Sequence, residues 1–163
     1  MQKLINKESS IDNPWVTLKE ATEPEALEAV RGKNLIVPLK FWKLFKAELS
    51  GDIGVWLDSD EKAEEIGEDL NELPLIALNF PAFSDGRSYS TARELRQRFS
   101  YKGEIRAIGD VLQDQLYYMS QCGFDTFELR PDQDSESCMQ AFADFKTGYQ
   151  ATIAEPNPLF RRR

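Results

Sequence analysis

The side chains best suited to chemistry lie in three turns between Pro74 and Pro131, each just past the end of a predicted strand. The first turn, FPAFSDGRSYS, carries four polar residues, Asp85, Arg87, Ser88 and Ser90. It joins a predicted strand to a predicted helix, where free N–H groups and the helix dipole attract anions. Gly86 allows close backbone approach, and the fork of Arg87 suits an oxyanion. Arg87, Ser88 and Ser90 are therefore predicted to bind phosphate, sulfate, sulfite or a carboxylate. In the alternative interpretation, Ser88 or Thr91 only caps the helix and Arg87 pairs with Asp85.

Two later turns place Asp110 and Arg130 just past the ends of two further predicted strands. Together with Arg87, Arg130 could form a positive mouth in an acidic chain, which is typical of a site for an anionic ligand. Asp85 and Asp110 are the candidate catalytic acids or bases of such a site. The competing interpretation is that Arg130 forms a surface ion pair with Asp132 or Asp110, which would contribute little.

No metal site is predicted. Asp58, Ser59 and Asp60 follow a strand, but acidic residues also commonly begin helices, and the other groups of a phosphoryl-transfer site are missing. The chain has no histidine and two cysteines, Cys122 and Cys138, too few for a zinc ribbon or a four-cysteine cluster. Both are expected to be reduced and at least partly buried. No cofactor is evident, because a GxGxxG motif is absent, although a non-covalently bound flavin is not excluded.

Short apolar runs alternate with amphipathic segments along the chain. Strands are predicted at residues 35–39, 53–57, 75–80, 104–109 and 126–129, each followed by a helix near 41–49, 61–73, 89–99, 110–122 or 135–146. Such alternation indicates one α/β domain with about five βα units around a parallel sheet. The sheet could belong to a partial (βα) barrel or to a flavodoxin-like three-layer sandwich.

Two charged residues in the middle of strands favour the partial barrel. Arg106 and Glu128 occupy consecutive predicted strands, and a central strand covered on both faces should be apolar throughout. We expect them on one polar inner face, within reach of each other or of a shared partner. A partial barrel leaves sheet edges, which an N-terminal hairpin within Leu4–Leu18, turning at SSIDNP, or a second subunit must cover. A homodimer is therefore among the expected states.

Composition limits the partners. The chain has 163 residues and a formal charge of −8, which argues against a nucleic acid or an anionic membrane as partner. No apolar run approaches the ~20 residues that span a bilayer, and residues 1–15 lack a signal-peptide core. The expected location is the cytoplasm.

The chain divides into three predicted parts. Residues 1–33 hold the hairpin and a short helix near 22–30, residues 34–148 the βα repeat, and residues 149–163 a tail. The tail combines an apolar pair, Leu159 and Phe160, with three arginines at 161–163. It is predicted either to be a frayed end or to dock on an acidic, grooved surface of a partner or of a second copy.

Three strings resemble an uncharacterised bacterial family whose genes commonly lie beside those of assimilatory sulfite reductase. They are GVWLDSDE at 54–61, LPLIALNFPAFSDGRSYSTAR at 73–93 and GEIRAIGDVLQDQLYYMSQCGFDTFELRPD at 103–132. Some members are labelled probable oxidoreductases in sulfite reduction. The resemblance implies an accessory protein of sulfite or sulfate assimilation that binds an anionic ligand or docks to sulfite reductase components. The alternative is a small-molecule enzyme acting on a phosphorylated or sulfur-oxyanion substrate at the carboxyl ends of the strands.

Overall fold

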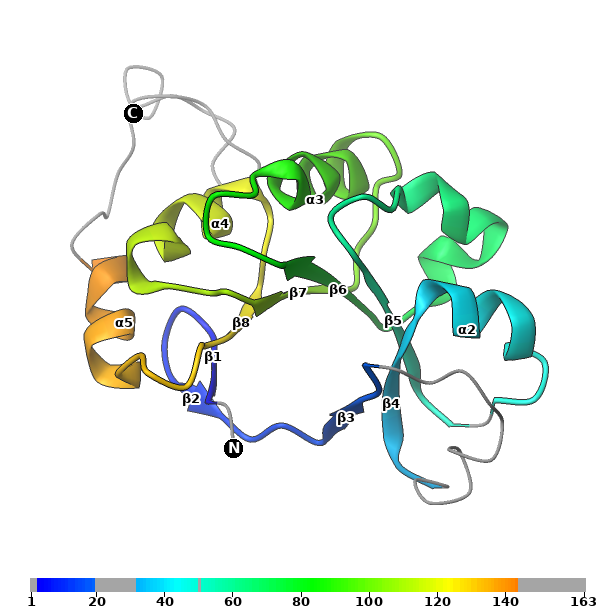
Figure 1. Cartoon of the computed structure of the whole chain (residues 1–163), viewed down its shortest axis with the longest axis horizontal. Helices are drawn as coiled ribbons and strands as arrows, with labels where there is room; N and C mark the ends of the chain where they lie inside the picture. Colours follow the sequence, from blue (N-terminus) through cyan, green and yellow to red (C-terminus); the bar gives the residue numbers. More distant parts are fainter. Residues whose placement is uncertain (1–2, 20–31, 50, 144–163) are drawn as a thin grey trace.

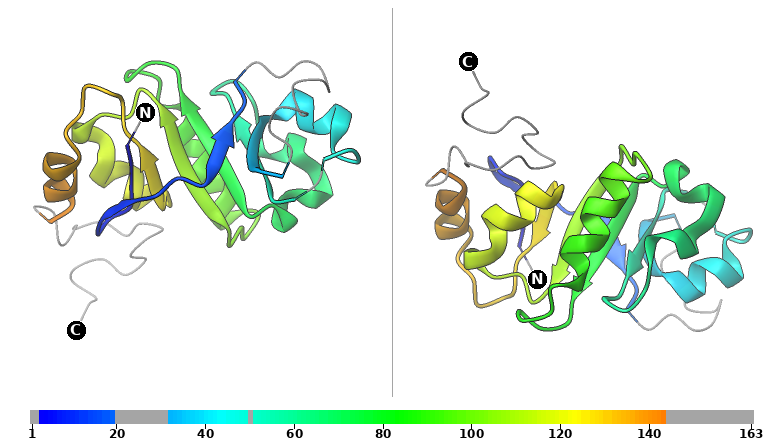
Figure 2. Two further views of the ribbon diagram at one scale, coloured as in Figure 1. Left: turned by 90° about the horizontal axis from the view of Figure 1, so that it is seen from below. Right: turned by 90° about the horizontal axis from the view of Figure 1, so that it is seen from above.

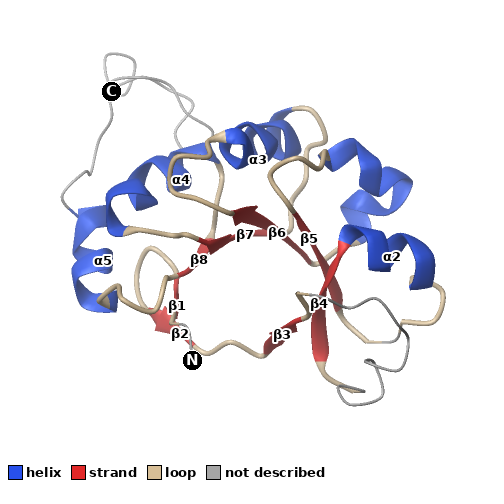
Figure 3. Ribbon diagram, viewed as in Figure 1, coloured by secondary structure: helices blue, strands red, loops and turns tan. Residues whose placement is uncertain are grey.

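The fold is a curled sheet with helices along its outer side (Figures 1 and 3). The computed structural model describes residues 3–19, 32–49 and 51–143. The strands are β1 (Leu4–Ile5), β2 (Ser10–Ile11), β3 (Trp15–Thr17), β4 (Asn34–Pro38), β5 (Ile53–Leu57), β6 (Leu75–Phe80), β7 (Glu104–Gly109) and β8 (Thr126–Glu128). The helical segments are α2 (Leu39–Phe45), η1 (Ala63–Glu72), α3 (Arg87–Gln97), η2 (Gln113–Gln115), α4 (Leu116–Cys122) and α5 (Ser135–Ala143).

The eight strands run in the order β2-β1-β8-β7-β6-β5-β4-β3. Strands β3 to β8 are mutually parallel, and β1 pairs antiparallel with both β8 and β2. Five βα units, from β4–α2 to β8–α5, build this half-barrel. Figure 2 shows the described helices on one side of the strands. The partial-barrel prediction is confirmed, and the three-layer sandwich is not the fold.

The main hydrophobic core lies between the outer face of the sheet and these helices. Alternate strand residues such as Val55, Leu78 and Phe127 point into it and are fully buried. A smaller apolar cluster, of Ile36, Leu75, Ala77 and Ile108 with Trp15 and Trp56 against it, covers the inner face. The sheet is therefore buried on both faces, which explains its nearly continuous apolar strands.

Arg106 lies on the inner face and is almost fully buried. Its guanidinium donates to Glu104 Oε1 (Nη2, 3.0 Å) and to Asn13 Oδ1 (Nη1, 3.0 Å), and Nε lies 3.3 Å from Thr126 Oγ1. Arg106 is in register with Thr126, and Glu128 lies two residues farther along the same face. The prediction that Arg106 and Glu128 share a face is confirmed, although the ion pair of Arg106 is with Glu104.

Three predicted elements differ clearly from the structure. The helix predicted at 110–122 begins as the 3₁₀ segment η2 at Gln113 and becomes α4 only at Leu116. The N-terminal hairpin turns at residues 6–9 instead of SSIDNP, because Trp15–Thr17 pairs with β4 and not with β1. The predicted helix at 61–73 is a pair of short 3₁₀ segments, interrupted where Gly67 adopts φ 84° and ψ −149°. The short helix predicted near 22–30 and the tail at 149–163 lie outside the described residues.

Candidate functional site

The candidate site is the edge of the sheet where β5 to β8 end. Parallel strands present their carboxyl ends at one edge, the usual place for ligands in α/β proteins. We call this edge the C-terminal rim and define it by Asp58, Ser59, Asp85, Arg87, Asp110, Arg130 and Asp132. Its charged side chains form two clusters, one around each arginine.

In the first cluster, Arg87 is held by Asp85. Arg87 Nε and Nη2 donate to the two carboxylate oxygens of Asp85 at 3.0 and 2.7 Å, and the backbone N–H of Arg87 donates to the same carboxylate at 3.1 Å. Nη2 also donates to Ser59 Oγ at 2.9 Å. The carboxylate of Asp85 thus occupies the start of α3, where the sequence predicted an external anion.

This arrangement leaves Arg87 accessible and Asp85 ionised. The Arg87 side chain is 62% exposed, whereas that of Asp85 is 15% exposed. Hydrogen bonds from the Arg87 side chain and backbone, and one with Ser59, hold the pKa of Asp85 well below its usual value. At neutral pH Asp85 is therefore an acceptor for Arg87 and is poorly suited to act as a general acid.

The two serines of the loop have different environments. Ser88 is buried, and its Oγ donates to the backbone oxygen of Asn79 at 2.8 Å, which fixes the first turn of α3 to the end of β6. Ser90 is exposed on α3. The cap position of α3 is Gly86, without a side-chain hydrogen bond, so neither Ser88 nor Thr91 is the cap residue. Of the two hydroxyls, only that of Ser90 is open to solvent.

In the second cluster, Arg130 is held by Asp132 and lies beside Asp110. Arg130 Nε and Nη2 donate to the two oxygens of Asp132, each at 2.6 Å, and Nη1 is 3.7 Å from Asp110 Oδ1. The hydrogen bond from the Arg130 side chain is the main reason that the pKa of Asp132 falls to about 2. Arg130 therefore links the turns that follow β7 and β8.

A glycine allows this close approach of the strand ends. The N–H of Asp110 donates to the backbone oxygen of Phe80 at 2.8 Å, and Gly109 before it has φ 90°. A Cβ on Gly109 would lie 2.4 Å from Asn79 Oδ1 and 2.5 Å from Phe80 O. Glycine is thus required at this position both by the backbone angle and by the space available.

The structure brings the predicted residues together in pairs. Asp85 contacts Arg87, and Asp110 contacts Arg130. No hydrogen bond or ion pair between described residues joins the first cluster to the second. The single four-residue mouth suggested by the sequence is therefore two neighbouring charge clusters on one rim.

Sequence reasoning missed the polar residues that complete the inner side of the rim. Asn79 Nδ2 donates to Asp58 Oδ1 at 3.1 Å, so the ends of β5 and β6 are tied together. Asn79 is in register with Ile108 of β7. An asparagine in the otherwise apolar strand LIALNF was the available signal, because a polar residue on a buried strand needs a partner.

Glu128 ends β8 on the same inner face and is only 8% exposed. Burial raises the pKa of Glu128, while the charges of Arg106 and Lys19 act in the opposite direction. Within the described part of the chain, no hydrogen bond to its carboxylate is found. Glu128 is therefore a buried carboxyl group that holds its proton to higher pH than an ordinary glutamate.

The described residues include no group of three or more His, Cys, Asp or Glu side chains placed to hold a metal ion. Cys122 and Cys138 are free and buried, as predicted, and burial raises the pKa of both thiols. None of the described helices is long and apolar enough to cross a membrane.

A curled parallel sheet with helices on its outer side and a charged rim at its strand ends places this chain among the α/β half-barrel proteins. The family model described as "Bacterial protein of unknown function (DUF934)" matches residues 54–160, well over half of the chain. This chain therefore belongs to the bacterial family DUF934. No curated protein and no solved structure gives a significant match.

Proposed function

We propose that this protein is an accessory protein of assimilatory sulfite reduction, which binds an anionic group at the C-terminal rim and thereby docks to a sulfite reductase component. The link to sulfite reduction rests on the gene neighbourhood that the sequence resemblance implies. The observation that supports anion binding is the fork of Arg87, exposed at the start of α3 and already aligned by a carboxylate.

Asp85 orients Arg87 for the recognition of an anion. Its carboxylate holds Arg87 in the two-pronged geometry that an oxyanion or a partner carboxylate would need. An incoming anion takes the place of Asp85 on Arg87 and on the N–H groups at the helix start. The exchange is nearly balanced, because one carboxylate-like group replaces another, so binding is expected to be reversible.

A second candidate function is a small-molecule enzyme with its acid on the inner face. Buried Glu128, at the carboxyl end of β8, favours this candidate, because burial raises its pKa and a carboxyl group with a raised pKa is a candidate general acid. Asp85 fits this role less well, since its pairing with Arg87 keeps it ionised.

The anion site is tested by titrating sulfite, sulfate and phosphate by calorimetry into the wild type, Arg87→Ala and Asp85→Asn. Loss of Arg87 is expected to weaken binding roughly tenfold or more, because a hydrogen bond to a charged group contributes about 1.5–3 kcal/mol. Asp85→Asn is expected to bind anions more tightly, since the competing charge is removed.

Arg98→Ala is the matched control, because Arg98 is also exposed and paired with carboxylates but lies at the other end of α3. It should bind like the wild type. Equal binding by the wild type and Arg87→Ala, or no binding of any of the three anions, would contradict the anion site.

A further inference from the structure

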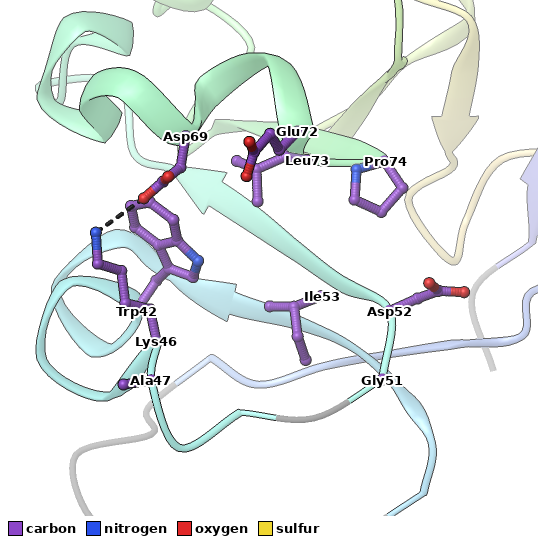
Figure 4. A pocket seen from close by; sticks show the side chains of 10 residues that line it. All are labelled: Trp42, Lys46, Ala47, Gly51, Asp52, Ile53, Asp69, Glu72, Leu73 and Pro74. Atoms are coloured by element: carbon purple, nitrogen blue, oxygen red, sulfur yellow. Dashed lines mark hydrogen bonds and ion pairs between the residues drawn. The ribbon is translucent and has the colours of Figure 1, made fainter.

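A groove lies at the opposite edge of the sheet, where β5 and β6 begin. It is a cavity of about 410 Å³, within the range of about 300–1,000 Å³ typical of ligand sites. Trp42 of α2, Ile53, Leu73 and Pro74 form its apolar lining, between α2 and the end of η1 (Figure 4). Trp42 and Leu73 are buried floor residues, whereas Pro74 is exposed at the edge.

The groove is negatively charged. Lys46 Nζ bonds Asp69 Oδ2 at 2.8 Å and lies 5.1 Å from the centre of the Trp42 ring, so its charge is already matched (Figure 4). The other two acids of the lining, Asp52 and Glu72, are exposed. Among described residues, no lysine or arginine lies within ion-pair distance of either. Two carboxylates with no cationic partner among the described residues therefore flank an apolar floor.

An occupant should combine an apolar side chain for the floor with cationic groups for Asp52 and Glu72. Further apolar surface is available nearby, because Leu44 is 75% exposed and lies one helical turn before Ala47, which lines the groove. These requirements describe a short apolar and basic peptide.

The chain itself contains such a peptide outside the described residues. Leu159–Arg163 reads LFRRR, an apolar pair followed directly by three arginines. Residues 144–158 separate it from α5, and when extended they span up to roughly 50 Å. A linker of that length lets the segment contact surfaces well away from α5, on the same molecule or on a neighbouring copy.

We propose that the groove formed by Trp42, Ile53, Leu73 and Pro74, with Asp52 and Glu72 at its edge, is the docking site for the Leu159–Arg163 segment of this chain. The apolar pair packs on the floor, and the arginines face the two acids. The proposal is independent of the function proposed for the C-terminal rim.

The test uses a full-length chain whose own segment is disabled by five alanine substitutions. A fluorescein-labelled peptide of residues 155–163 is titrated into this protein, and anisotropy is measured over a salt series. Saturable binding that weakens as salt rises is expected, because the contacting charges are exposed. The five substitutions are Leu159→Ala, Phe160→Ala, Arg161→Ala, Arg162→Ala and Arg163→Ala.

Asp52→Lys with Glu72→Lys, added to this protein, should weaken peptide binding at least about tenfold, because like charges then face each other. Glu8→Lys is the control, because it replaces an acidic residue by lysine at an exposed position in the β1–β2 turn, away from the groove. It should leave peptide affinity unchanged. If the double variant is poorly folded by circular dichroism, Ala47→Arg, which fills an exposed part of the groove, replaces it.

Absence of peptide binding, or unchanged affinity in the folded groove variants, would overturn the proposal. A peptide with alanine at Leu159 and Phe160 should also lose affinity; retention would overturn the role of the apolar pair. Sedimentation of the wild-type chain identifies the source of the segment. A dimer that dissociates with the five substitutions indicates a second copy, and a compact monomer indicates the same chain.

Discussion

At the scale of residues, the charged groups of the rim are organised by short-range pairing. Arg87 and Arg130 each bind a carboxylate two residues away in sequence, Asp85 and Asp132. Such pairs contribute little stability when exposed. Their effect is to hold each guanidinium fork in one orientation, and an incoming anion has to displace the paired carboxylate.

Sequence reasoning located these residues but could not choose between their partners. A loop with Asp85, Gly86 and Arg87 at the start of a helix satisfies either an external anion or an internal ion pair, and both use the same residues. The contact between Ser59 and Arg87, which are 28 positions apart in the sequence, is created by the tertiary fold. A local sequence pattern therefore cannot predict this contact.

Glu128 gives a pH prediction at this scale. Its pKa in the folded protein is raised above the ordinary 4.5. The stability it contributes is therefore fully present below the unfolded-state pKa and is lost as pH rises through the folded-state pKa. Glu128→Gln should melt at a higher temperature than the wild type at pH 7, and the gap should close near pH 4.

Thermal unfolding followed by circular dichroism at both pH values measures this difference. Glu8→Gln, at an exposed position, is the control and should match the wild type at each pH. A Glu128→Gln protein that melts lower than the wild type at pH 7 would show that the ionised carboxylate is stabilising, contrary to the burial argument.

At the scale of elements, the strands of the βα repeat were predictable, including the three-residue β8, whereas the short N-terminal strands were not. Strands 53–57, 75–80 and 104–109 match the predicted bounds, because their apolar character reflects burial on both faces. The two- and three-residue strands β1, β2 and β3 carry too little pattern to fix their partners. Trp15–Thr17 joined β4 because the curled sheet presented an open parallel edge there.

The inner face of β7 gives a stability prediction. Arg106 is 2% exposed in its side chain and bridges Glu104, Thr126 and Asn13. Arg106→Ala would remove the shared donor of the half-buried Glu104 and the buried Thr126 and would empty the space of a fully buried side chain, and should lower the free energy of unfolding by roughly 3 kcal/mol. Urea denaturation measures the change.

Arg98→Ala is the comparison, because Arg98 is 58% exposed and also pairs with carboxylates. It should cost less than about 1 kcal/mol. If the two substitutions cost the same, the buried network would not be a significant support of the curled sheet.

At the scale of the whole molecule, the half-barrel separates two surfaces. The C-terminal rim carries aligned arginines at the ends of β5 to β8, and the acidic groove lies where β5 and β6 begin. A docking event at one edge therefore need not block the other. Five successive βα units predicted the parallel sheet with its right-handed crossovers, and the mid-strand charges of Arg106 and Glu128 favoured the partial barrel over the three-layer sandwich.

In the proposed function, the rim docks to a sulfite reductase component through its arginines. The most direct measurement is the equilibrium binding of purified sulfite reductase components to the wild type, to Arg87→Ala/Arg130→Ala and to Arg98→Ala, by biolayer interferometry over a salt series. We predict saturable binding of the wild type and Arg98→Ala that weakens with salt, and at least about tenfold weaker binding of the double variant. No binding by the wild type at any salt concentration, or equal binding by the double variant, would contradict the account.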